Sequence, residues 1–204
     1  MSRSRTWLAG FFLLATALVL AAGEAADFSA QLTPLIDPAK LATLGQRAAN
    51  PRLQKAVAVL AATKASGADP AEVARQAVGR AGYKAEAANL TAAALLRNLD
   101  IAGKLGCLDP EGLAAMRRGN APTVRRGPYA GEKATVDHII PRAVVPELDN
   151  VIANLELMPA QLNESKRDKI GARQLDLARK FHQAGLLSKA GLKAVEKAGK
   201  RSAK

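Results

Sequence analysis

The sequence predicts an α+β fold that is mostly α, with a helical N-terminal region, a compact strand–strand–helix unit and a basic C-terminal helix. Ala/Leu-rich segments that start at Asp-Pro or Asn-Pro predict the first part, and β-branched residues with Gly/Pro turns after Met116 predict the second. The 204 residues suffice for one or two small domains. Lys and Arg number 30 against 18 Asp and Glu, so the net charge of +12 favours an anionic partner.

The N-terminal segment, residues 1–25, resembles a secretory signal. Arg3 and Arg5 precede an uncharged, apolar run over residues 6–23, and small residues follow at Gly23 and Ala25. This three-part pattern predicts cleavage and a secreted or periplasmic mature protein. The alternative is an uncleaved anchor, which would make the membrane a partner, because 18 uncharged residues are at the lower limit for a span.

Residues 26–116 are expected to form a helical region. Four Asx-Pro dipeptides mark helix starts, because the Asx side chain caps the first turn and proline needs no amide partner there; they begin at Asp37, Asn50, Asp69 and Asp109. Asp69 and Glu72 also have the spacing of a capping box. Helices are predicted over 53–64, 71–81 and 86–105. Nothing in this region indicates a reaction, and its expected role is scaffolding or shaping of the substrate site.

The candidate chemistry falls within residues 117–180. Strands are predicted over 122–126 and 134–140, with a helix after Pro159. Asp137 and His138 are adjacent near the end of the second predicted strand. Because neighbouring strand residues point to opposite sides, only a bulge or a strand end would let both serve one site.

Further polar residues follow Asp137 and His138 along the chain. Asn154 comes first, and Asn163 and Lys166 then lie one turn apart on the predicted helix. Carboxylate and amide oxygens suit hydrated Mg²⁺, and a neutral imidazole can deprotonate water. Cationic side chains that would suit a phosphodiester surround these positions: Arg125, Arg126, Arg142, Lys166 and Arg167.

The segments VDHIIPRA and NLELMPAQLNESK, separated by ten residues, together resemble the signature of the HNH endonuclease family, which has the ββα-metal fold. The resemblance covers roughly residues 117–175. It implies that His138 is the general base and that Asp137 and Asn163 bind one divalent ion. It also implies that Asn154 fixes the loop and orients His138, and that Lys166 touches phosphate or supports the helix.

The sequence departs from the family pattern at two places. Asn163 stands where the family name has its last histidine, so Mg²⁺ is the expected cofactor and Mn²⁺ the second choice. Many relatives bind a structural zinc through two CxxC pairs, whose second pair would fall here at Pro159 and Leu162. The single cysteine, Cys107, is expected to be a buried apolar residue and not a nucleophile.

Three functional hypotheses remain open. The first is an exported, metal-dependent endonuclease with low sequence specificity, because few aromatic residues are present to stack bases; duplex DNA is the first substrate and RNA the second. The second is a non-catalytic basic nucleic-acid-binding envelope protein. The third is a membrane-anchored factor with its basic face near anionic lipids. Residues 181–204 form a basic helix or tail, and the sequence implies no protein partner.

Overall fold

The fold is described from a computed structural model for residues 27–166 and 169–202. Residues 27–36 are helical. The helices that follow are α2 (Pro38–Ala42), α3 (Ala49–Ala65), α4 (Pro70–Arg80), α5 (Ala85–Lys104), α6 (Pro110–Arg117), α7 (Ala160–Lys166), α8 (Ala172–Gln183) and α9 (Lys189–Ser202). The strands are β1 (Ala134–His138) and β2 (Leu155–Pro159), and the short 3-10 turns are η1 (Pro146–Leu148) and η2 (Ile152–Asn154). The predicted α+β, mostly α class is confirmed; α3 contains the first predicted helix, and α4 and α5 cover the other two except for the last predicted residue of each.

Three of the four predicted Asx-Pro starts are helix caps. The carboxylates of Asp37, Asp69 and Asp109 accept first-turn amides of α2, α4 and α6, and proline follows each. The fourth start is wrong, because α3 begins at Ala49 with no side-chain cap of its own. The Ala49 amide donates instead to Oδ1 of the distant Asn150 at 3.0 Å. A residue 101 positions away has therefore replaced the local cap.

The predicted capping box at the start of α4 is also wrong. Asp69 accepts from the Ala71 amide, but the Glu72 side chain turns away from the cap. It accepts hydrogen bonds from Arg75 and Gln76, which lie one turn further along the helix. An ion pair within α4 has therefore replaced the reciprocal cap.

The two strands pair antiparallel, and Asp137 lies opposite Glu156 while His138 lies opposite Leu155. The strand predicted over 122–126 is wrong, since that segment has only an isolated bridge between Thr123 and Lys133. The amides of Arg125 and Arg126 both donate to the Leu105 carbonyl, which takes the chain away from the sheet. The partner of β1 is instead β2, which follows a connection of sixteen residues and leads directly into α7.

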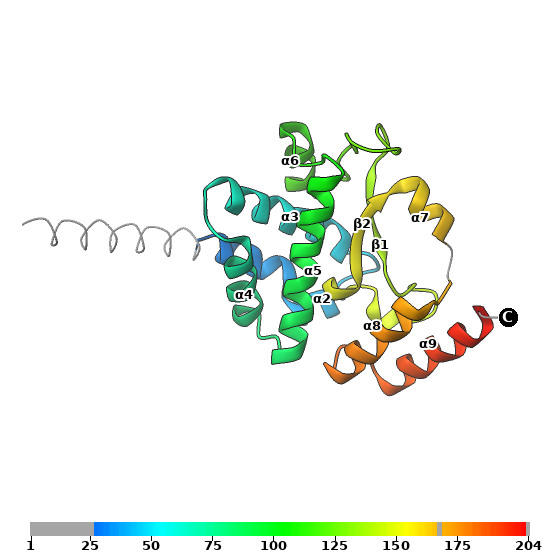
Figure 1. The fold of residues 1–204 in the computed structure, drawn as a ribbon. Coiled ribbons are helices and arrows are strands. Elements are labelled where there is room, and N and C mark those ends of the chain that lie inside the picture. The colour runs from blue at the N-terminus through cyan, green and yellow to red at the C-terminus, as the bar shows by residue number, and fades with distance from the viewer. Residues whose placement is uncertain (1–26, 167–168, 203–204) are drawn as a thin grey trace, which may run out of the picture.

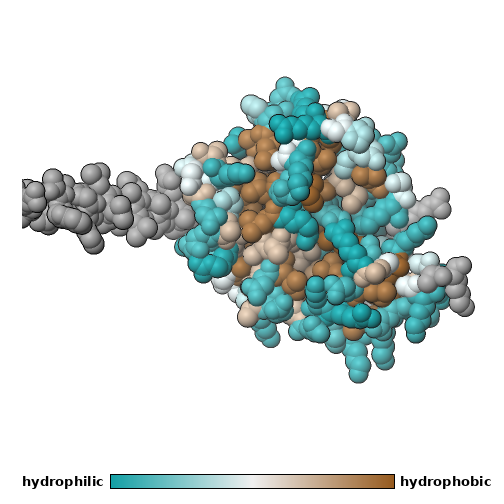
Figure 2. All heavy atoms as spheres, in the orientation of Figure 1, coloured by the Kyte–Doolittle hydropathy of each residue, from teal (hydrophilic) through white to brown (hydrophobic). Residues whose placement is uncertain are grey.

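The sheet is packed between α5 on one side and α7 on the other (Figure 1). One apolar cluster joins α3, α4 and α5 to the sheet through residues that include Val136, Leu155 and Leu157. In the face shown in Figure 2, apolar side chains gather around α5 and hydrophilic ones surround them. The helical region and the strands therefore share one core.

Asn98 on α5 completes the outer edge of β2. Its side chain is fully buried, its Nδ2 donates to the Leu155 carbonyl at 3.0 Å, and its Oδ1 accepts from the Leu157 amide at 2.7 Å. A two-stranded sheet leaves such edge groups without a strand partner, and burial would make them costly. The Asn98 side chain thus supplies two hydrogen bonds that a neighbouring strand would otherwise make with the edge of β2.

A second apolar cluster, around Phe181, packs α8 and α9 against the connection between the strands. Glu156 of β2, which is 6% exposed, ties α8 to the sheet through a bidentate pair with Arg173. Arg97 of α5 lies 4.0 Å from the same carboxylate, and burial lowers the pKa of its guanidinium. These contacts fix β2 to α5 and α8. The basic C-terminal helix is confirmed as α9.

The predicted signal segment, residues 1–25, lies outside the described residues. Among the helices of residues 27–166 and 169–202, none has the length and apolar character to cross a membrane.

Candidate active site

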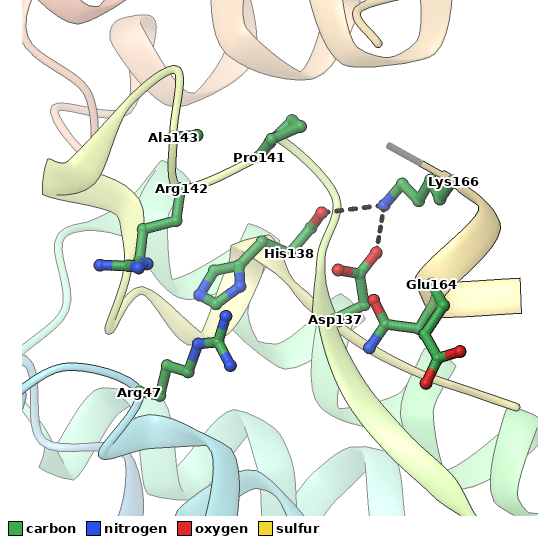
Figure 3. A pocket seen from close by; sticks show the side chains of 9 residues that line it. Arg47, Asp137, His138, Pro141, Arg142, Ala143, Glu164 and Lys166 are labelled. Carbon is green, nitrogen blue, oxygen red and sulfur yellow. Dashed lines mark hydrogen bonds and ion pairs between the residues drawn. The ribbon is translucent and has the colours of Figure 1, made fainter. Parts of the chain in front are cut away.

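His138 is the last residue of β1. A strand end is one of the two arrangements that allow the neighbouring side chains of Asp137 and His138 to serve one site. Along β1, alternate residues face opposite sides, with His138 on the more buried side and Asp137 on the other. At the end of the strand the two side chains nevertheless line one pocket of about 330 Å³. Asn163, Glu164 and Lys166 of α7 complete one wall of this pocket. The predicted adjacency of these polar residues is therefore present (Figure 3).

The imidazole of His138 is 7% exposed and has a defined partner on one nitrogen. Nε2 lies 2.9 Å from the backbone carbonyl oxygen of Asp149. Because a carbonyl oxygen only accepts, hydrogen bonding assigns the proton of the neutral ring to Nε2. Nδ1 is then unprotonated, and no described residue bonds to it. This tautomer leaves Nδ1 as the nitrogen that can accept a proton.

Asp149 makes further contacts around the histidine. Its Oδ1 lies 3.0 Å from His138 Nε2 without forming a hydrogen bond, and its Oδ2 accepts from the Arg47 amide at 3.0 Å. Arg142 Nε lies 4.0 Å from the same Oδ1. A buried carboxylate thus sits behind the imidazole, where it would stabilise positive charge on the ring.

Asn154 braces the loop that follows His138. Its side chain is fully buried, with Oδ1 accepting from the Ile140 amide at 2.8 Å. Its Nδ2 donates to the carbonyls of Ile140 and Leu148 at 3.0 and 3.4 Å. The Asn154 side chain bonds to backbone groups of Ile140 and Leu148 and not to the imidazole, so it acts on His138 through the backbone of this loop.

Asp137, Asn163 and Lys166 form the opposite wall of the pocket. Lys166 Nζ lies 2.5 Å from Asp137 Oδ2 and 2.8 Å from the His138 carbonyl oxygen (Figure 3). Asn163 Nδ2 donates to Thr135 Oγ1 at 3.1 Å, which leaves its Oδ1 without a partner among the described residues. Asp137 Oδ1 likewise accepts no hydrogen bond from them.

These two oxygens fit the donor chemistry of a hard divalent cation. One carboxylate and one amide oxygen on the same pocket match Mg²⁺, which keeps several waters and takes phosphate oxygens as its other ligands. Within residues 27–166 and 169–202, no three His, Cys, Asp or Glu side chains gather closely enough to form a metal cage. Any ion bound here would therefore share Asp137 with Lys166.

The predicted nucleic-acid-binding cations are separated by the fold. Arg142 and Lys166 line the pocket, whereas Arg125 pairs with Asp109 at 2.9 Å and also with Glu111, on α6. Arg126 is exposed on the same loop as Arg125. Arg167 lies outside the described residues. The predicted burial of Cys107 is confirmed.

Arg47 is a pocket residue that the sequence interpretation missed. It comes from the turn between α2 and α3, and its side chain extends toward the His138 ring (Figure 3). No motif surrounds Arg47 in the sequence. The loop that carries it is docked beside the site through Asp149 and Asn150, which are about a hundred residues away.

Comparisons of the chain with protein-family models, with curated proteins and with solved structures each found no match.

Proposed function

We propose that this protein is an exported, metal-dependent endonuclease of the HNH type, which hydrolyses DNA phosphodiester bonds with low sequence specificity. The observation that carries the proposal is the arrangement of His138. Its Nε2 is anchored on a carbonyl oxygen, and its Nδ1 is unpartnered in a pocket shared with Asp137, Asn163 and three cationic side chains. The order β1, β2, α7 matches the strand–strand–helix order of the ββα-metal fold that the sequence resembles.

In this proposal, His138 Nδ1 takes a proton from a water molecule as the water oxygen attacks the phosphorus. The P–O bond to the leaving sugar oxygen breaks, and the Asp149 carboxylate stabilises the imidazolium that forms. Arg142 binds a non-bridging phosphate oxygen and orients the diester. Asp137 and Asn163 would hold the divalent ion, which supplies positive charge to the developing phosphate and leaving-group anions.

One observation favours a second candidate, a basic nucleic-acid-binding protein without catalysis. The ammonium of Lys166 already neutralises Asp137, as would be expected of a site that has exchanged a metal for a lysine. Such a protein would bind DNA equally well with and without Mg²⁺ and would not cut it.

Plasmid nicking distinguishes the two candidates. The purified protein should convert supercoiled plasmid to open circles with Mg²⁺, and EDTA or His138→Ala should abolish this conversion. His182→Ala is the matched control, because His182 also contacts a backbone carbonyl, that of Leu187 at 3.0 Å, but does not line the pocket. A gel shift without nicking in Mg²⁺, Mn²⁺ and Zn²⁺ would establish the binding protein. Nicking that survives His138→Ala would exclude the proposed site.

A further inference from the structure

Arg47 is unusual in its backbone as well as in its position. Its φ of 57° lies in the left-handed region, and no other non-glycine residue of the described chain has a positive φ. Glycine and asparagine adopt this conformation readily, whereas arginine does so at an energetic cost. Strained residues of this kind cluster where function requires a particular side chain. The strained backbone at position 47 therefore points to a function of the Arg47 side chain.

The turn that carries Arg47 is fixed against the connection between the strands. The Arg47 amide donates to Asp149 Oδ2, and Asn150 Nδ2 donates to the Gly45 carbonyl at 3.0 Å. The Ala49 amide completes the junction by donating to Asn150 Oδ1. Because Asp149 also contacts His138, the backbone of residue 47 is positioned relative to the imidazole through one carboxylate.

The guanidinium of Arg47, by contrast, is uncommitted. It forms no ion pair and no hydrogen bond with any residue of the described chain, although Asp137, Asp149 and Glu164 lie in or beside the same pocket. Arg125 shows the opposite arrangement, with its charge neutralised by two carboxylates. Arg47 and Arg142 extend on the same side of His138, away from Lys166 (Figure 3). Two guanidiniums that line one pocket match the paired oxygens of a phosphate group.

We propose that Arg47 binds the scissile phosphate and that the N-terminal helical region thereby supplies a substrate-binding residue that lies outside the strand–strand–helix unit. This inference rests on the proposed nuclease function and names a substrate-binding residue in a region that was predicted to be a scaffold or to shape the substrate site. Arg47 and Arg142 hold the non-bridging oxygens of the diester on the side of the imidazole opposite Lys166. Cleavage then requires both regions of the chain.

The test uses substitutions that respect the left-handed backbone. Arg47→Gly and Arg47→Asn remove the charge and relieve the strain, so their thermal midpoints should equal or exceed that of the wild type. Their kcat/KM on a short duplex with Mg²⁺ should fall by about 10- to 100-fold. Arg47→Lys keeps the charge but loses the planar fork, so its kcat/KM should be intermediate. Arg118→Gly is the matched control, because Arg118 is exposed, forms no ion pair with described residues and does not line the pocket.

Duplex binding in EDTA gives a second readout that does not depend on cleavage. The slope of log K against log salt concentration should decrease by about one for Arg47→Gly and not for Arg118→Gly. If the wild type cleaves and both Arg47 variants cleave equally well, this inference is wrong while the nuclease function stands. If the wild type does not cleave, the nuclease function fails, and an unchanged slope for both variants would then overturn the phosphate contact as well.

Discussion

His138 Nε2 faces two oxygens of a single residue, the backbone carbonyl of Asp149 at 2.9 Å and its carboxylate Oδ1 at 3.0 Å. The carbonyl oxygen accepts a hydrogen bond from the Nε2–H group and fixes the tautomer of the ring. The carboxylate is a counter-charge that gains importance only when the ring becomes cationic. In the proposed mechanism, Asp149 is a positioning residue whose contribution is greatest after proton transfer.

Asp149→Asn should lower kcat about tenfold or more while KM changes little, because the amide can still accept from the Arg47 amide but offers the imidazolium no charge. Steady-state cleavage of a short duplex measures both constants. Asp176→Asn is the control, since Asp176 pairs with Lys180 at 2.9 Å on the exposed side of α8. An unchanged kcat for Asp149→Asn would remove Asp149 from the mechanism.

Lys166→Met should increase the affinity for Mn²⁺ about three- to tenfold, because the ammonium that competes for Asp137 is gone. Isothermal titration calorimetry without DNA measures this effect independently of catalysis. Lys180→Met removes an equal charge that pairs with Asp176, far from the pocket, and should leave the Kd unchanged. Equal affinities for wild type and Lys166→Met would show that Asp137 is not a ligand.

Asn98→Leu should lower the free energy of unfolding by about 2–3 kcal/mol, because the Leu157 amide loses its only partner in a buried position. Denaturant unfolding followed by circular dichroism measures the loss. The exposed Asn120 provides the control, since Asn120→Leu should change stability by less than about 0.5 kcal/mol. A small effect of Asn98→Leu would mean that the edge of β2 does not depend on this side chain.

Alkaline pH should weaken the fold in part through Cys107. Burial raises the pKa of this thiol to about 11. The folded protein therefore keeps the proton that the unfolded chain releases near pH 9, and stability falls as the pH rises from about 9 to 11. Over that range the free energy of unfolding of Cys107→Ala should decline less than that of the wild type, by about 1–3 kcal/mol.

Urea denaturation at several pH values provides this comparison. Tyr83, whose pKa burial raises to about 12, is present in both proteins and does not affect the difference. Parallel declines for wild type and Cys107→Ala would contradict the expected role of the thiol.

The helix caps at Asp37, Asp69 and Asp109 were predictable because cap and helix are adjacent in the chain. The strand β2 was not, because its outer edge is completed by Asn98, which lies 57 and 59 residues from its two partners. The strand predicted over 122–126 is absent for a similar reason, because the amides of Arg125 and Arg126 donate to the carbonyl of Leu105, about twenty residues earlier in the chain. Local signals predicted local structure, and side chains from elsewhere decided the rest.

The candidate site likewise combines residues that the sequence pattern predicted with residues that distant contacts bring to it. The resemblance to the HNH signature predicted that Asp137, His138, Asn163 and Lys166 would meet, and all four line the pocket. Arg47 and Asp149 have no such register with the others. They reach the pocket through the docking of a loop on a distant connection, which depends on the whole core.

That docking also has a consequence for the order of folding. The hydrogen bonds that join residues 44–49 to Asp149 and Asn150 close loops of 101 to 106 residues. Contacts of such separation form late, because the chain loses much entropy before they contribute. A growing chain that ends before residue 149 contains Arg47 but lacks the groups that fix its turn, so the complete pocket exists only in a finished molecule.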